Sequence, residues 1–301
     1  MPETQRTTPA TRIVRTPNFD IRFPPLPRTV ADVTKLVAEM HEEPETARLV
    51  RIVDSDPVVA GFVLRRINSA YYGVRRRVGD VQKAVHLLGF EEVCDIVLTS
   101  GMMRLQDILH SGEQAGIFDQ IMRMSVGTAS FSKKLASHLD LFQQSSAFTI
   151  GLLHTCGRLV LLYNRPDDYE ALWCSNHGGF APTVTSEQIV FGTDHAELGA
   201  KAADSWHLPE LVVTMIRQYL TPGHIEDHDL RVLALTLAVS AQACERLCLD
   251  RMPASARFEP SAALHLLSKA VRMDAAEIAA FVEENRLEVF EYTHSMVDPD
   301  A

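Results

Sequence analysis

Apolar residues recur at intervals of three and four along almost the whole chain, and no stretch of useful length alternates apolar with polar residues. Val30, Val33 and Val37 are one example, because this spacing places all three side chains on one face of a helix. Glycines and prolines, which commonly end or begin helices, separate the periodic segments. The pattern therefore predicts an all-α protein.

The residues at the ends of these segments predict where individual helices start and stop. Asp56-Pro57 is a strong start signal, since Asp is a good N-cap and Pro is tolerated at the first helical position. Gly89 is a natural end for a helix over 81–88. Further helices are expected at about 91–109, 118–138, 145–162, 167–176, 184–191, 195–206, 209–219, 229–249, 261–270 and 274–289.

The same pattern predicts two bundles and two tails. Residues 1–22 are polar and lack periodicity, so we expect a disordered N-terminal tail. The segment 111–116 contains two glycines and is the best boundary candidate. We therefore expect an N-terminal helical bundle over 23–112, packed on a larger bundle over 113–290, and a C-terminal tail over 291–301.

Composition argues against several classes of protein. The chain has 29 Lys and Arg against 39 Asp and Glu, a formal charge of -10, whereas general nucleic-acid binding needs a concentrated positive face. No apolar run approaches the roughly 20 residues of a membrane span, and the first residues lack the apolar core of a secretory signal. A cytoplasmic protein without membrane attachment is expected. Five scattered cysteines with no CxxC pair predict no disulfide framework.

Four ordered stretches carry a resemblance to a known family. They are Phe23-Pro24-Pro25-Leu26-Pro27; Asp56-Pro57 with Asn68-Ser69-Ala70-Tyr71-Tyr72-Gly73; Val81 to Gly89; and Gly151-Leu152-Leu153-His154-Thr155-Cys156-Gly157-Arg158-Leu159 with Asp194 to Gly199. In this order they resemble the motifs of the HDOD family, a non-catalytic branch of the HD phosphohydrolase superfamily. The resemblance spans about residues 23–285. It implies that the larger bundle is a degenerate HD-like domain.

The resemblance also identifies the positions where active HD enzymes hold divalent metals. Met124, Thr155 and Val239 stand at three such positions in this chain, and none of these side chains is a good ligand for those cations. His154 and His195 match family histidines. A dismantled metal site is therefore implied, with no catalytic residue and no cofactor. We expect both imidazoles to be hydrogen-bonded inside the bundle, with residual metal binding or ligand sensing as alternatives.

The leading functional hypothesis is a regulatory, signal-transduction module that acts by binding a protein or a small ligand. The resemblance implies signalling proteins as partners in trans, such as receivers, diguanylate cyclases or kinases. One alternative is a divalent-metal phosphohydrolase acting on a nucleotide or cyclic dinucleotide, with Glu197, Asp204 or His207 as replacement ligands. Another alternative is a sensor that binds a nucleotide second messenger without turnover.

One short segment combines residue types that are frequent in binding hot spots. Tyr71 and Tyr72 are followed by Arg75, Arg76 and Arg77, the densest positive cluster on an acidic chain. The tyrosines can form an aromatic plug that closes a bundle, and the arginines can simply keep a turn solvated. The other interpretation is a surface that recognises an acidic partner or a nucleotide phosphate. The segment is the candidate partner-binding site.

Overall fold

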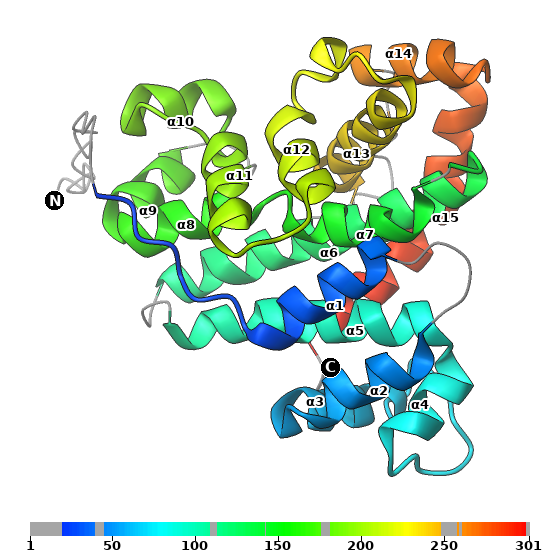
Figure 1. Cartoon of the computed structure of the whole chain (residues 1–301). Coiled ribbons are helices and arrows are strands. Elements are labelled where there is room, and N and C mark those ends of the chain that lie inside the picture. The colour runs from blue at the N-terminus through cyan, green and yellow to red at the C-terminus, as the bar shows by residue number, and fades with distance from the viewer. Residues whose placement is uncertain are drawn as a thin grey trace, which may run out of the picture.

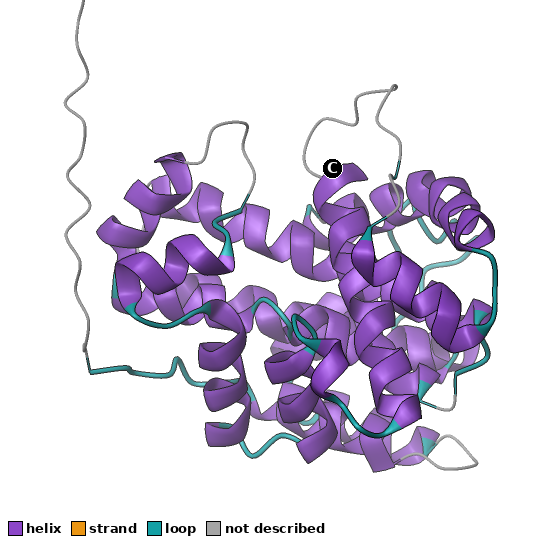
Figure 2. Cartoon of the chain, turned by 90° about the horizontal axis from the view of Figure 1, so that it is seen from above, coloured by secondary structure: helices purple, strands orange, loops and turns teal. Residues whose placement is uncertain are grey.

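The computed structural model describes residues 20–39, 45–108, 113–141, 143–175, 181–247, 258 and 261–298. Within these ranges the chain consists of helices and connecting turns, and no strand is present (Figure 2). The helices are α1 Arg28–Glu39, α2 Thr46–Asp54, α3 Pro57–Ile67, α4 Val81–Leu88, α5 Phe90–Met103, α6 Glu113–His138, α7 Gln144–Leu153, α8 Cys156–Asn164, α9 Pro166–Ser175, α10 Val184–Phe191, α11 His195–Ser205, α12 Glu210–Gln218, α13 His228–Leu247, α14 Ala262–Val271 and α15 Ala275–Val297, with the 3-10 turns η1 Arg104–Ile108 and η2 Pro222–His224. The all-α prediction is confirmed.

The N-terminal bundle consists of α1 to α5. Both α1 and α3 pack against α5, and α2 and α4 pack against α3 and against each other (Figure 1). The predicted start of α3 is confirmed, since the carboxylate of Asp56 accepts hydrogen bonds from the backbone N of Val58 at 3.1 Å and of Val59 at 3.3 Å. Gly89 has φ +88° and ends α4 as expected.

The larger bundle is built around α6, which packs against α7, α13 and α15 (Figure 1). This helix begins at Glu113, earlier than the expected position near residue 118, and so runs through part of the boundary segment 111–116. A Cβ at Gly116 would meet nothing within 4 Å, so the helix passes this glycine without a packing conflict. Residues 109–112 lie outside the described residues.

The stretch expected to form one helix over 145–162 is divided between α7 and α8. The division falls at His154 and Thr155, which separate the two helices. The most apolar 18-residue window of Gln144–Asn164 has a mean hydropathy of 1.3, and 94% of this window is buried inside the protein. It is therefore the central core element of this bundle.

A disordered tail is predicted over residues 1–22, and for residues 1–19, which lie outside the described residues, it stays a prediction. Residues 20–22 lie outside any helix or strand, before the expected start at residue 23, and Arg22 is held by hydrogen bonds. The backbone N of Arg22 donates to Oδ1 of Asn164 and its carbonyl accepts from Nδ2, both at 2.8 Å. Nε1 of Trp206 donates to the carbonyl of Pro24 at 2.9 Å. These contacts hold the segment against the larger bundle as it passes towards α1 (Figure 1).

The expected C-terminal tail over 291–301 is wrong for most of its length, because α15 continues to Val297. Tyr292 and Met296 are buried in this last part of the helix. Met296 lies against Arg66 of α3, whose Nε donates to its sulfur at 3.2 Å. The main core cluster accordingly runs from Val30 in α1 to Val297 in α15, so the two bundles share one interior.

Candidate functional site

Glu187 of α10 is the centre of a buried polar network. Its Oε1 accepts a hydrogen bond from Arg158 of α8 at 2.9 Å, and its Oε2 accepts from the backbone N and Nδ1 of His195 at 2.9 and 2.6 Å. Nε2 of His195 lies 2.7 Å from the hydroxyl of Tyr219. Arg158 also donates to the carbonyl of Pro182 at 2.9 Å. The network joins α8, α10, α11 and the end of α12.

The protonation states follow from burial and charge. Burial alone would raise the pKa of Glu187, but the interactions with Arg158 and His195 lower it by more than burial raises it. The pKa of Glu187 is therefore below its ordinary value, and the carboxylate is ionised. Burial raises the pKa of Tyr219, so its hydroxyl keeps its proton and forms a hydrogen bond with Nε2 of His195. Because an ionised carboxylate can only accept, Nδ1 of His195 carries a proton and donates to Glu187. Both ring nitrogens of His195 are therefore engaged.

His154 is buried at the end of α7, next to this network. Its Nδ1 lies 2.5 Å from the carbonyl oxygen of Gly151, and its ring packs edge-on against Tyr219 with centroids 5.4 Å apart. Burial lowers the pKa of His154 to about 3, so the imidazole is neutral at physiological pH. The expectation that both histidines are hydrogen-bonded inside the bundle agrees with this geometry.

Met124, His154 and His195 line one cavity of about 490 Å³, so the structure brings these three family positions together. A thioether is a poor ligand for a hard or borderline cation. Both ring nitrogens of His195 are held by Glu187 and Tyr219. Within the described ranges, no three His, Cys, Asp or Glu side chains converge as metal ligands. The side chains at this position do not fit a divalent metal.

Thr155 and Val239, the other two substituted positions, form contacts with the interior of the larger bundle. Thr155 is buried, and its Oγ1 hydrogen-bonds to Oγ of Ser125 on α6. Val239 of α13 is buried in the second core cluster, formed mainly by α13, α14 and α15. A threonine hydroxyl and a valine therefore stand where the resemblance implies carboxylates, and each is satisfied by the interior of the bundle.

The three residues considered as replacement ligands lie towards the surface. Glu197 is half-buried, and its carboxylate forms ion pairs with Lys201 at 3.2 Å and with Arg217 at 3.6 Å. Asp204 and His207 are exposed. Their positions give no support to a metal centre assembled from residues outside the family pattern.

The aromatic pair divides its roles between the two tyrosines. Tyr72 is half-buried, and its hydroxyl donates to Glu92 at 2.5 Å, whereas Tyr71 is 41% exposed. Tyr71 packs edge-on against Tyr72 and Tyr292, with centroids 5.0 and 6.0 Å apart. The guanidinium of the buried Arg66 lies 5.7 Å from the ring centroids of both Tyr71 and Tyr72. Tyr72 closes the bundle, and Tyr71 is held in place while presenting its ring to solvent.

The turn that follows displays the arginine cluster. Arg75, Arg76 and Arg77 are exposed, and within the described part of the chain none of them forms a hydrogen bond or ion pair. Asn68 fixes this turn, since its Nδ2 donates to the carbonyl of Val78 at 2.9 Å and its Oδ1 accepts from the backbone N of Val78 at 2.8 Å. The structure therefore places the candidate partner-binding residues on a closed, exposed turn.

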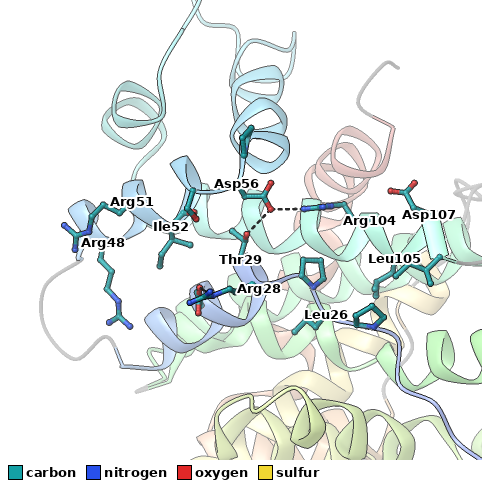
Figure 3. Close-up of a pocket in the computed structure, with 16 residues that line it drawn as sticks. Leu26, Arg28, Thr29, Arg48, Arg51, Ile52, Asp56, Arg104, Leu105 and Asp107 are labelled. Atoms are coloured by element: carbon teal, nitrogen blue, oxygen red, sulfur yellow. Dashed lines mark hydrogen bonds and ion pairs between the residues drawn. The ribbon is translucent and has the colours of Figure 1, made fainter.

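The proline-rich stretch that begins at Phe23 and the Asp56-Pro57 pair both line a groove of about 910 Å³ (Figure 3). The groove is lined by Pro25 to Pro27 and by Asp56, whose Oδ2 accepts from Oγ1 of Thr29 at 3.1 Å and from the guanidinium of Arg104 at 2.8 Å. Asp56 also caps α3. One carboxylate thus joins α1, α3 and η1, which explains the Asp-Pro signal as a structural one.

Sequence reasoning did not find the central carboxylate of the buried network. Glu187 precedes Val190 and Phe191 by three and four residues, so it lies on the apolar face of its helix. A carboxylate on such a face was a signal that it has a buried partner. That partner is Arg158, which lies within the motif stretch Gly151 to Leu159. Spacing along the chain does not show that the two side chains meet.

The comparisons with known proteins agree with this geometry. The fold is similar to an HDOD domain protein with unknown function from Geobacter sulfurreducens, with a TM-score of 0.73, 17% identity, and 91% of this chain and 93% of that chain covered. It is similar to a candidate signal transduction protein from Marinobacter aquaeolei VT8, with a TM-score of 0.71, 22% identity, and 96% and 63% covered. It is also similar to a candidate phosphohydrolase from Shewanella amazonensis SB2B, with a TM-score of 0.64, 23% identity, and 91% and 94% covered. These identities show the fold alone.

The sequence comparisons identify the family. An uncharacterized protein of Treponema pallidum (strain Nichols) is 25% identical over 196 residues, which are 65% of this chain and 37% of that protein. This chain therefore spans little more than a third of the length of its relative. The HDOD domain family matches residues 23–222, which is more than half of the chain. The chain belongs to the HDOD domain family.

Proposed function

We propose that this protein is a non-catalytic regulatory module that acts in the cytoplasm by binding a signalling partner. The observation that carries the proposal is the state of His195, whose Nδ1 and Nε2 are both held by protein groups, Glu187 and Tyr219. Hydrolysis of the HD type needs a metal that lowers the pKa of a bound water. Here the corresponding position supplies a thioether and two buried imidazoles.

The similar structures include a candidate signal transduction protein and a candidate phosphohydrolase, so the rival function is metal-dependent phosphodiester hydrolysis. Elemental analysis and an activity assay on the purified full chain distinguish the two functions. We expect less than stoichiometric Mn, Fe, Zn or Mg, and no hydrolysis of bis-p-nitrophenyl phosphate or a cyclic dinucleotide with any of these metals added. A matched variant restores the ligand types: Met124→His with Thr155→Asp and Val239→Asp should bind more metal than the natural chain.

The proposal would be overturned by one tightly held metal per chain together with hydrolysis that His195→Ala abolishes. Such a result would show that Tyr219 and Glu187 release the ring for coordination. Retained hydrolysis in His195→Ala would instead identify a contaminating enzyme, because the site could not act without this imidazole.

The partner surface that fits this function is Tyr71 with Arg75 to Arg77. The ring of Tyr71 is pre-positioned by Tyr72, Tyr292 and Arg66, so little entropy is lost when a partner covers it. The arginines are a local positive patch on a chain of charge -10. An acidic signalling protein is attracted to this patch while the rest of the surface repels it.

A photo-crosslinking residue in place of Tyr71 tests this surface in the native cell. We expect one dominant adduct at position 71, and its loss at high salt or when the three arginines are replaced by alanine. The matched control places the crosslinker at Tyr163, a half-buried tyrosine of α8 outside the patch. The same adducts at positions 71 and 163 would remove the patch from partner recognition.

A further inference from the structure

A cleft of about 670 Å³ lies where the N-terminal bundle meets the larger bundle. Its volume is within the range of small-molecule sites in proteins. Aromatic rings from both bundles form much of its wall, and they are Tyr71, Tyr72, His138, Phe148, Phe281 and Tyr292. His138 and Phe281 form a flat stacked pair, with centroids 4.0 Å apart and an interplanar angle of 16°. Flat aromatic surfaces of this kind are suited to stacking against a planar ring.

One polar group in this wall has no hydrogen-bond partner among the residues that the structure describes. The hydroxyl of Tyr292 is buried without a hydrogen bond, although the side chain lines the cleft and is 8% exposed. Leaving a buried hydroxyl unsatisfied costs free energy. Tyr71, which is 41% exposed, packs edge-on against this ring at 6.0 Å and lines the cleft beside it.

The charged groups of the cleft favour a ligand that donates hydrogen bonds and carries no phosphate. Glu92 accepts from the hydroxyl of Tyr72 at 2.5 Å, and Asp95 pairs with Lys133 at 2.6 Å. Glu288 pairs with Lys134 at 2.7 Å. Each lysine is already neutralised, and each carboxylate has further lone pairs to accept N–H groups. A phosphate would meet three carboxylates without an unpaired cation in this wall.

We propose that this cleft binds a planar nitrogen heterocycle of the purine type, stacked on its aromatic wall and hydrogen-bonded through ring N–H and amino groups to Glu92 and Asp95. The hydroxyl of Tyr292 supplies one further hydrogen bond. Because the walls come from both bundles, a bound ligand stabilises their packing. The inference rests on the proposed regulatory function only in treating the ligand as a signal and not as a substrate.

Titration calorimetry and thermal unfolding of the full chain, with adenosine and guanosine as probes, test the proposal. We expect one nucleoside bound per chain, a higher unfolding temperature in its presence, and weaker binding of the corresponding 5′-monophosphate. Tyr292→Phe should leave stability unchanged or slightly higher, because the hydroxyl has no partner, and weaken binding about three- to tenfold. Glu92→Gln keeps an acceptor for Tyr72 and should weaken binding about tenfold.

Tyr163→Phe is the matched control, since it removes a tyrosine hydroxyl from α8 outside the cleft, and it should leave binding unchanged. Absence of binding by both nucleosides at millimolar concentration would overturn the inference. So would equal affinity in the natural chain, Tyr292→Phe and Glu92→Gln. Tighter binding of the monophosphate that disappears when Arg75 to Arg77 are replaced would place the site on the arginines instead. None of these results depends on metal content or hydrolysis, which test the proposed function separately.

Discussion

Glu187 accepts two hydrogen bonds from one residue, His195, through the backbone N at 2.9 Å and Nδ1 at 2.6 Å. The side chain of Glu187 is fully buried, and its other oxygen pairs with Arg158 at 2.9 Å. The free-energy cost of removing these charges from water offsets most of the gain from their attraction, so the intact network adds little net stability. Removing a single member leaves a buried charge without its partner, and that loss is large.

Glu187→Gln should therefore lower the free energy of unfolding by about 3–5 kcal/mol, because it leaves the guanidinium of Arg158 buried without a counter-charge. Denaturant unfolding followed by circular dichroism measures the change. Glu197→Gln is the control, because its partners are half-exposed and the loss should be about 1 kcal/mol or less. Equal small losses in both variants would show that the buried pair carries no such penalty.

His154 makes stability depend on pH in a predictable direction. Its pKa is about 3 in the folded protein, against an ordinary value of 6.5 for a solvated histidine, so the unfolded chain binds the proton more readily. The stabilising contribution is complete above pH 6.5 and is lost as the pH falls towards 3. Between pH 7 and pH 5 this one group should remove about 2 kcal/mol.

His154→Asn isolates this contribution, because asparagine can still donate to the carbonyl of Gly151 but does not titrate. The variant should be less stable at pH 7, and its stability should fall about 2 kcal/mol less than that of the natural chain between pH 7 and pH 5. His86→Asn is the matched control, because it makes the same replacement at an exposed histidine of α4. Parallel pH profiles for the natural chain and His154→Asn would contradict the buried, neutral state.

The order and type of the helices could be predicted because their signals are local. Asp56 and Gly89 stand at helix ends that the structure confirms. The end of α15 could not be predicted in this way, since Ser295 and Met296 are held by Arg66 of α3, a residue far away in the sequence. Arg66 and Met296, which are in contact, are 230 positions apart in the sequence.

The candidate site was predictable to a similar extent. The motif resemblance placed Met124, His154 and His195 together, and the structure agrees. It did not show which carboxylate would hold His195, since Glu187 comes from a different helix with no metal-ligand spacing. Which side chains meet in a buried network depends on which helices pack closely together. Gly157 is one residue that allows the close approach of α8 and α11.

Gly157→Ala should test the crossing of α8 and α11. A Cβ at this position would lie 1.9 Å from the carbonyl oxygen of His195 and 2.6 Å from the backbone N of Gly199, so the helices would have to separate. We expect a loss of about 3 kcal/mol or more, at or above the usual cost of overpacking. Gly61→Ala is the opposite case, since its Cβ meets nothing within 4 Å inside α3, and it should stabilise by about 0.5–1 kcal/mol.

Asp56→Ala should destabilise the protein by about 1–2 kcal/mol, because it removes the N-cap of α3 together with the contacts to Thr29 and Arg104 (Figure 3). The pKa of this carboxyl is below its ordinary value, although burial alone would raise it, because the hydrogen bonds from Val59 and Thr29 favour the charged form. Its contribution should therefore be present at neutral pH and lost as the pH falls through the lowered pKa.

Asp56→Asn separates the two roles, since asparagine caps a helix about as well but cannot pair with Arg104. It should cost less than half as much as Asp56→Ala, and equal losses in reversible denaturant titrations would show that the ion pair, and not the cap, is the important contact.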